Sequence, residues 1–295
     1  MNSLGKKKEI FTQCLVCGFS PDIKFKHLRH HEQWDLYQCP KCSFQFWWPI
    51  EQAPQVYFEK EYKIFADIHQ KSNFGSNHKL ALKLTPVKKG TILDVGCGDG
   101  RFVAKMNDRG FNVWGIDFNH KAIEKAKRIF NLSNFYPLSI YDFIKFPKLP
   151  KFDLITFFEV LEHIGDPQKF ISAIKSLLIN KGFIIFSVPN SIRYGRWEEI
   201  VNVPPHHITR WTEQTLKVFL LNNGFRIIIL KKIDRPDSEC FLMNILLYFF
   251  RNIPWNLSRF PKIRVLWRYL SFPLRELLFL LGISPTFFVI AQLKN

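Results

Sequence analysis

"ILDVGCGDGRF", residues 92–102, is the stretch that decides the fold. A run of β-favouring residues passes into Gly96, Gly98 and Gly100, and a helical pattern follows directly. Glycines at this point let the chain turn sharply out of a strand and let a ligand approach the backbone closely. A dinucleotide-binding loop needs a further glycine where Arg101 stands, so the register excludes that type of loop.

Short β-rich runs and helical runs alternate on both sides of this loop. The expected strands are 91–96, 112–117, 152–160, 183–189, 225–233 and 286–294, and the expected helices are 101–110, 120–130 and 167–182. This alternation predicts an α/β fold with a doubly wound, mostly parallel sheet. Ligands of such sheets bind at the carboxyl ends of the strands, which places the site at the glycine loop.

Two acidic residues stand at the ends of the first two expected strands. Asp94 precedes the glycine loop, where its charge would repel a pyrophosphate but suits a cationic cofactor with an amino acid tail. Asp117 follows about twenty residues after the loop, where a carboxylate can accept hydrogen bonds from both ribose hydroxyls. Glycine turns and strand-end aspartates also occur without ligands, but the joint pattern favours a cofactor site.

The same segments carry a family resemblance. "ILDVGCGDGRF" with "VWGIDFN" (113–119), "IYDF" (140–143) and "FDLITFFEVLEHIGDP" (152–167) resembles the motifs of class I S-adenosylmethionine-dependent methyltransferases, over roughly residues 70–235. The resemblance implies a seven-stranded Rossmann-like sheet and S-adenosylmethionine as cofactor.

The resemblance also implies a role for each cofactor residue. The loop from Asp94 to Gly100 would hold the methionine moiety and Asp117 the ribose hydroxyls, while Phe118 and Asp142 would contact the adenine. Phe158 and Glu159 would line the pocket facing the substrate. The full predicted set is Asp94, Gly96, Cys97, Gly98, Gly100, Asp117, Phe118, Tyr141, Asp142, Phe158 and Glu159.

Methyl transfer needs alignment and, for a hydroxyl acceptor, removal of a proton. "EVLEHI" (159–164) offers Glu159, Glu162 and His163, and on a helical turn the first and last of these share a face. Three interpretations stay open here. His163 is the general base, or the three residues bind a divalent ion as similar segments of quinone O-methyltransferases do, or they only cap and orient the loop before Pro167.

"VPPHHITRWT" (203–212) places two further histidines, His206 and His207, just before a helix that Thr212 is expected to cap. The stretch resembles a loop of methyltransferases that act on sugars or glycan precursors, including enzymes fused to a zinc ribbon. That resemblance implies that one of the two histidines contacts the substrate or acts as base. The alternative is that they hold the loop through backbone carbonyls. The predicted catalytic residues are therefore His163, His206 and His207.

Two CxxC pairs, Cys14 with Cys17 and Cys39 with Cys42, stand near the N-terminus. Their separation is close to the roughly 15–20 residues typical of zinc sites, and four thiolates leave no coordination position open for catalysis. The sequence therefore predicts a structural zinc ribbon. A disulfide pair or a redox CxxC is the less favoured alternative, and the intervening His27, His30 and His31 are expected at the surface.

Four segments are expected along the 295 residues. They are a ribbon over 1–50, a core with N-terminal helices over 51–236, a helical basic and aromatic insertion over 237–284, and a final strand over 285–295. The insertion suits added helices, an oligomer interface, or peripheral membrane contact through 241–283. The N-terminus lacks the apolar core of a signal peptide and no apolar run has bilayer-spanning length, so we expect a cytoplasmic protein.

The favoured function at this point is methyl transfer to a hydroxyl of a sugar or glycan precursor in polysaccharide biosynthesis, lipid-linked or nucleotide-linked. RNA methylation is the alternative, because the formal net charge is +17 and zinc ribbons can bind RNA. Against RNA, no N/D-P-P-Y/F amino-methylating motif is present. A non-catalytic scaffold is disfavoured by the intact glycine loop.

Overall fold

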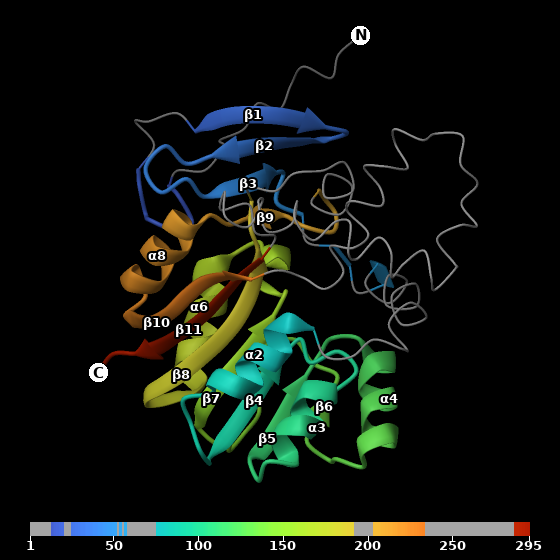
Figure 1. Ribbon diagram of the computed structural model, residues 1–295. Helices are drawn as coiled ribbons and strands as arrows, with labels where there is room; N and C mark the ends of the chain where they lie inside the picture. The colour runs from blue at the N-terminus through green and yellow to red at the C-terminus, as the bar shows by residue number, and fades with distance from the viewer. Residues whose placement is uncertain are drawn as a thin grey trace, which may run out of the picture.

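Figure 1 shows the computed structural model, which describes residues 13–20, 25–51, 53–54, 56–57, 75–191, 203–233 and 286–295. The expected insertion at 237–284 and the basic N-terminal tail lie outside the described residues. Among those residues, no helix combines the length and the apolar character needed to cross a membrane.

A seven-stranded sheet forms the centre of the molecule, in the order β10-β11-β8-β7-β4-β5-β6. Strands β6, β5, β4, β7 and β8 run parallel, whereas β11 and β10 at the other edge pair antiparallel. The strands are β4 Thr91–Val95, β5 Asn112–Ile116, β6 Phe135–Tyr136, β7 Phe152–Phe158, β8 Leu178–Pro189, β10 Phe225–Ile233 and β11 Thr286–Leu293. The prediction of a Rossmann-like, mostly parallel sheet is confirmed.

Helices cover the sheet and begin at the caps that the sequence provides. They are α2 Ser76–Leu84, α3 Arg101–Asn107, α4 His120–Phe130, α5 Ile140–Phe143, α6 Pro167–Leu177 and α8 Glu213–Asn222, with a short 3₁₀ helix η1 Leu161–His163. Thr212 caps α8, because its hydroxyl accepts a hydrogen bond from the N–H of Thr215 at 3.1 Å. The expected cap at this position is confirmed.

One predicted boundary is wrong. The helix expected over 167–182 ends at Leu177, and β8 begins with Leu178, five residues earlier than expected. Leu178 is buried and pairs with Phe152 of β7. The run "LLIN" satisfies both helical and strand patterns, and its pairing with the neighbouring strand decides for the strand.

A second, smaller sheet lies over one end of the large sheet (Figure 1). Three of its strands come from the cysteine-bearing segment: β1 Lys26–His31, β2 Trp34–Gln38 and β3 Gln45–Trp48. The fourth is β9 Thr209–Arg210 from the C-terminal half of the chain, and the order is β1-β2-β3-β9. Strand β3 pairs antiparallel with β9, which directly follows the predicted catalytic histidines. The small sheet is therefore shared between the N-terminal segment and the core.

Candidate active site and cysteine cluster

The glycine turn leaves β4 at its carboxyl end and is tied to β5. The N–H groups of Gly96 and Cys97 donate to the carbonyl of Ile116 at 2.8 and 3.0 Å. The N–H of Gly98 donates to Oδ2 of Asp117 at 2.9 Å. The structure thus brings together the loop and the carboxylate that the sequence assigns to one cofactor.

Backbone conformation explains why glycine stands in this turn. Gly96, Gly98 and Gly100 have φ values of +73°, +52° and +76°, in the left-handed region that glycine adopts most readily. A Cβ at Gly98 would meet no atom within 4 Å, whereas one at Gly96 would lie 2.6 Å from Cγ2 of Val160. The turn is therefore open at Gly98, and at Gly96 it touches the segment that follows β7.

Two carboxylates that form no ion pair with any described residue stand beside this turn. Asp94 is 3% exposed and accepts a hydrogen bond from the hydroxyl of Thr156 at 2.6 Å; burial raises its pKa to about 7. Burial also raises the pKa of Asp117, against the opposing effect of the N–H groups of Asn119 and Gly98. Neither carboxylate forms an ion pair with a described residue. Uncompensated acids beside an open glycine turn fit a cationic ligand that carries hydroxyl groups.

The residues predicted beside the adenine lie farther along the sheet. Phe118 follows β5, and Tyr141 lies in α5 with its pKa raised by burial to about 12. Asp142 is exposed, with one carboxylate oxygen accepting from the Ser139 hydroxyl at 2.7 Å and the other from Nζ of Lys145 at 2.8 Å. In this structure the Asp142 carboxylate is bonded to Ser139, the residue that caps the start of α5. Its contact with adenine stays a prediction.

Glu159 does not share a helical face with His163, as the sequence suggested. Its φ is +55°, and only Leu161–His163 forms a 3₁₀ turn. The N–H of Glu159 donates to the Ser187 carbonyl at 3.0 Å, and the Ser187 hydroxyl donates to Oε1 of Glu159 at 2.8 Å. Asn77 of α2 completes the chain by donating to that hydroxyl at 3.1 Å. Glu159 therefore faces β8 and α2 rather than the histidine.

Sequence reasoning missed α2 as part of this region. The ring of His78 lies 4.6 Å from that of Phe158, in a T-shaped arrangement, and 5.5 Å from that of Phe102. Burial lowers the pKa of His78 to about 4, so this imidazole is neutral at physiological pH. The "SNH" that begins α2 carries no spacing motif, and only the packing reveals it.

The three predicted catalytic histidines come together although 43 residues separate the first two. Nδ1 of His163 lies 2.6 Å from the carbonyl oxygen of His206. The ring centroids of His163, His206 and His207 are 4.6 to 5.0 Å apart. One ring nitrogen from each residue lies within 4.8 Å of the others.

Burial keeps two imidazoles of this cluster, those of His163 and His206, neutral. Burial lowers the pKa of His163 to about 3 and also lowers that of His206. Because a carbonyl only accepts, Nδ1 of His163 carries the proton and its Nε2 holds a lone pair. Nε2 of His207 lies 3.8 Å from Oε1 of Glu162, a carboxylate on a residue 1% exposed. The arrangement suits a proton acceptor with a negative charge nearby, or a set of neutral nitrogen ligands.

Comparison with known proteins decides the family. A family model described as "Methyltransferase domain" matches residues 68–230, more than half of the 295-residue chain. The chain belongs to this methyltransferase family. It is a class I S-adenosylmethionine-dependent methyltransferase, as the glycine turn and the seven-stranded sheet indicated.

Curated relatives cover part of the methyltransferase. A ubiquinone biosynthesis O-methyltransferase of Actinobacillus pleuropneumoniae is 36% identical over 106 residues, which are 34% of this chain and 45% of that protein. A protein of the same name from Alkalilimnicola ehrlichii is 38% identical over 104 residues, which are 34% of this chain and 41% of that protein. The chain thus spans less than half of the length of these relatives.

Solved structures show the same fold at low sequence identity. Phosphoethanolamine N-methyltransferase 2 of Haemonchus contortus, in complex with S-adenosyl-L-methionine, has a TM-score of 0.56 at 16% identity, over 93% of this chain and 72% of that one. A SAM-dependent methyltransferase of Archaeoglobus fulgidus has a TM-score of 0.52 at 19% identity, over 78% and 99%. At these identities the likeness concerns the fold.

The four paired cysteines of the methyltransferase converge as the sequence predicted. Sγ of Cys14 lies 3.6 Å from that of Cys42, and Sγ of Cys17 lies 3.8 Å from that of Cys39, with all four within 4.8 Å of one another. A tetrahedral zinc ion with Zn–S bonds of about 2.3 Å separates its sulfurs by about 3.8 Å. The hydrogen bond from Cys42 lowers the pKa of Cys14 to about 5, while burial raises that of Cys17 to about 11. The donor set fits a structural zinc ion.

The histidines between the two cysteine pairs lie apart from this cluster. Nε2 of His27 and Nδ1 of His30 both lie about 3 Å from Oδ1 of Asp35, at 2.9 and 3.0 Å, and their side chains are 51% and 63% exposed. His31 is half-buried and its ring lies 6.1 Å from that of Trp47. None of the three joins the group of four cysteines, in line with their expected surface positions.

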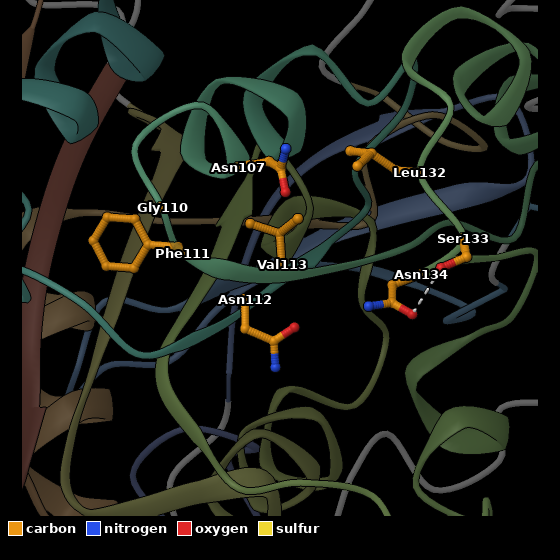
Figure 2. Close-up of a pocket in the computed structure, with 8 residues that line it drawn as sticks. All are labelled: Asn107, Gly110, Phe111, Asn112, Val113, Leu132, Ser133 and Asn134. Atoms are coloured by element: carbon orange, nitrogen blue, oxygen red, sulfur yellow. Dashed lines mark hydrogen bonds between the residues drawn. The ribbon is translucent and has the colours of Figure 1, made fainter.

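A hollow elsewhere on the methyltransferase is not part of this site. It has a volume of about 410 Å³ and lies at the amino end of β5, where Asn107, Asn112 and Asn134 line it (Figure 2). The predicted cofactor and catalytic residues stand at the carboxyl ends of the strands, and none of them lines this hollow. We assign it no role in methyl transfer.

Proposed function

We propose that this methyltransferase transfers a methyl group from S-adenosylmethionine to a hydroxyl of a sugar or glycan precursor. The observation that carries the proposal is the cluster of His163, His206 and His207 beside the buried Glu162. His163 follows β7 by a few residues, and Val160 in the same segment lies against the cofactor turn at Gly96. A proton acceptor therefore stands close to the glycine turn.

The geometry of the turn supports the cofactor roles that the family resemblance implies. When bound, S-adenosylmethionine supplies an electrophilic methyl group on a sulfonium. The loop from Asp94 to Gly100 would hold the methionine moiety, with the Asp94 carboxylate complementing positive charge. Asp117 would accept hydrogen bonds from the ribose hydroxyls, because two backbone N–H groups fix the orientation of its carboxylate. Phe158 and Glu159 would line the side toward the acceptor.

His163 is our candidate for the general base. Its Nδ1–H is held by the His206 carbonyl, so Nε2 is the atom that takes the proton from the acceptor hydroxyl. A pKa of about 3 makes His163 a weak base toward a free hydroxyl. The hydroxyl becomes far more acidic as its oxygen gains the methyl group, so the proton moves late. The carboxylate of Glu162 beside His207 then stabilises the positive charge within the cluster.

The cysteine cluster is proposed to hold a structural zinc ion. Four thiolates at tetrahedral spacing complete its coordination, so the ion would take no part in chemistry. The cysteine-bearing segment is too small to bury a sufficient core of its own, and zinc binding supplies folding free energy to such segments.

Two acceptor classes compete with the sugar. The relatives named ubiquinone biosynthesis O-methyltransferase, which match about a third of this chain, favour a hydroxyl of a ubiquinone precursor. The net charge of +17 favours RNA, as noted from the sequence. The loop at 203–212 favours the sugar, because its paired histidines resemble those of sugar-modifying enzymes.

The test is a transfer assay with full-length protein and isotopically labelled S-adenosylmethionine. The acceptors are nucleotide sugars, a lipid-linked saccharide, a catechol and total tRNA. We expect label in a base-stable ether on the saccharide. Label in the catechol alone moves the assignment to a phenol, and label in tRNA alone establishes the RNA alternative. Transfer to none of the four, with cofactor binding intact, contradicts the proposal.

A further inference from the structure

We propose that the cysteine ribbon is a positioning device for the acceptor site, so that metal held by its four thiolates fixes His206 and His207 in place. The ribbon here means residues 13–20 and 25–48, with the strands β1, β2 and β3. The inference rests on the proposed function for its catalytic consequence. Its structural content stands on contacts between the ribbon and the loop at 203–212.

The histidine loop is built into the ribbon's sheet. Directly after His207, the carbonyl of Ile208 accepts a hydrogen bond from the N–H of Trp47 at 3.0 Å. The next two residues form β9, where Thr209 pairs with Phe46 of β3. A two-residue strand has no stability alone and depends on the strand that it pairs with. The backbone next to the histidines therefore takes its register from the ribbon.

The opposite side of the same loop rests on the segment that carries His163. The N–H of Ile208 donates to the carbonyl of Glu162 at 3.0 Å, and the Thr209 hydroxyl donates to the carbonyl of Leu161 at 3.1 Å. The loop is thus held between β3 and η1. Without β3, the loop keeps its bonds to η1 and the contacts of Arg210 and Trp211 with the residues after β8, but it loses the pairing with Phe46 that sets the register of β9.

The metal-binding cysteines connect to this arrangement through their second pair. The carbonyl of Cys42 accepts a hydrogen bond from the hydroxyl of Thr215 at 2.9 Å, in the first turn of the helix that follows the loop. Phe44, whose carbonyl accepts from the Cys39 N–H at 2.8 Å, has its ring 5.2 Å from that of Trp211. Phe44 and Trp211 are both fully buried. The cysteine cluster is therefore connected to the segment that directly follows β9.

In the part of the chain that the structure describes, no hydrogen bond joins the cofactor turn to the ribbon. Gly96 and Gly98 are held by Ile116 and Asp117, and Asp94 by Thr156. These partners all lie in β4, β5 and β7 or directly after them. Loss of the metal should therefore disorder the acceptor end and leave the cofactor end in place.

The test compares full-length protein purified with zinc and the same protein after removal of zinc by a chelator. Metal content is measured by a colorimetric zinc assay, and backbone hydrogen exchange by mass spectrometry. We expect exchange in peptides covering 203–211 to accelerate by at least about tenfold in the metal-free protein, which corresponds to local opening easier by about 1.4 kcal/mol. Peptides covering 91–107 should keep their rate, and calorimetry should give an unchanged affinity for S-adenosylmethionine.

Two results overturn the inference. One is an unchanged exchange rate at 203–211 after complete loss of zinc. The other is loss of cofactor binding together with the metal, since the ion would then stabilise the whole domain rather than the loop. Neither readout needs an acceptor, so failure to find one bears only on the proposed function.

A variant with intact cysteines checks the route. Phe44→Leu removes the ring that packs against Trp211 and leaves all four thiols, so zinc content should stay the same. We expect turnover to fall by up to about 100-fold through misplacement of the histidines, with unchanged cofactor affinity. Gln168→Ala is the matched control, because Gln168 bonds the carbonyl of Val16 at 3.2 Å from α6, away from the loop. Equal turnover of Phe44→Leu and Gln168→Ala would count against the route.

Discussion

The cofactor end and the acceptor end of this enzyme adjoin at one edge of the sheet, but they are held together differently. The glycine turn and Asp117 are joined by contacts within residues 94–119, across two neighbouring strands, and Asp94 accepts a hydrogen bond from Thr156 of the adjacent strand β7. The histidine cluster is joined by contacts between 161–163, 206–209 and the N-terminal ribbon. The cofactor end thus depends mainly on contacts between residues close together in the sequence. The acceptor end depends on contacts between segments far apart in the sequence.

This difference has a functional meaning. A cofactor shared by many methyltransferases can be bound by a compact motif that folds with the central strands. An acceptor site has to vary, and contacts between distant segments allow it to change without altering the cofactor turn. We therefore expect the two ends to respond independently to substitution, and each experiment below tests that independence.

The largest effect is expected at the acceptor end. His163→Ala removes the imidazole proposed as the general base, and general-base catalysis contributes about 10²–10⁴-fold. We expect turnover on the true acceptor to fall by about 10³-fold, with cofactor affinity within twofold of the parent protein. Steady-state kinetics and calorimetry measure the two quantities. His30→Ala, at a histidine 63% exposed on the ribbon, is the control and should keep full turnover.

Near-normal turnover of His163→Ala would show that the base is elsewhere in the cluster, and His206→Ala and His207→Ala then identify it. A loss of cofactor affinity in His163→Ala would contradict the independence of the two ends.

A smaller effect, on affinity alone, is expected at the cofactor end. Asp117→Asn keeps the shape of the side chain but removes the charge and one of the two acceptors for the N–H groups of Gly98 and Asn119. We expect affinity for S-adenosylmethionine to fall by about 10–100-fold, as for a charged hydrogen-bonding group, with turnover at saturating cofactor little changed. Asp108→Asn, on an exposed pair with Lys105, should bind the cofactor normally. A fall in saturated turnover larger than the fall in affinity would contradict this assignment.

The two ends also differ in how far the sequence alone reveals them. The glycine turn, Asp117 and the Thr212 cap were predicted correctly as local features, because each depends on residues a few positions apart or on adjacent strands. The pairing of β3 with β9 and the role of His78 were not predicted. They arise from packing between segments far apart in the sequence, for which one sequence holds no periodic signal. The error in the predicted end of α6 has the same origin. The residues from Leu178 onward fit either a helix or a strand, and pairing of β8 with β7 makes them a strand.

Protonation of Asp94 should make the affinity for the cofactor depend on pH, which distinguishes the cofactor end from the acceptor end. Its pKa is about 7 in the absence of ligand, so the carboxylate is charged above pH 7 and neutral below it. A cationic ligand prefers the charged form, and its affinity should therefore fall by about tenfold for each pH unit below 7 and stay constant above pH 8. His163 at the acceptor end contributes nothing in this window, because its pKa is about 3. Calorimetry between pH 5.5 and about 8.5 measures the profile.

Asp94→Asn is the control for that profile. It should bind the cofactor more weakly at pH 8 and show no dependence on pH. A profile that stays flat in the unsubstituted protein would remove Asp94 from the cofactor site.

The smallest effect concerns the hydrogen bond that tunes Asp94. The Thr156 hydroxyl donates to its carboxylate at 2.6 Å and lowers its pKa, against the larger effect of burial. Thr156→Val removes the donor and keeps the shape, so the midpoint of the affinity profile should move up by about 0.5–1 pH unit, as expected for one hydrogen bond to a charged group. At pH 7 the affinity falls by about two- to sixfold, because half of the parent protein is already protonated there, and at pH 9 it is about equal to that of the parent protein. Thr156→Ser retains the hydroxyl and should keep the original midpoint. A pH-independent loss of cofactor affinity in Thr156→Val would instead mean that this side chain shapes the site without changing the pKa of Asp94. If the acceptor end is independent of the cofactor end, both variants should have the turnover of the parent protein at saturating cofactor.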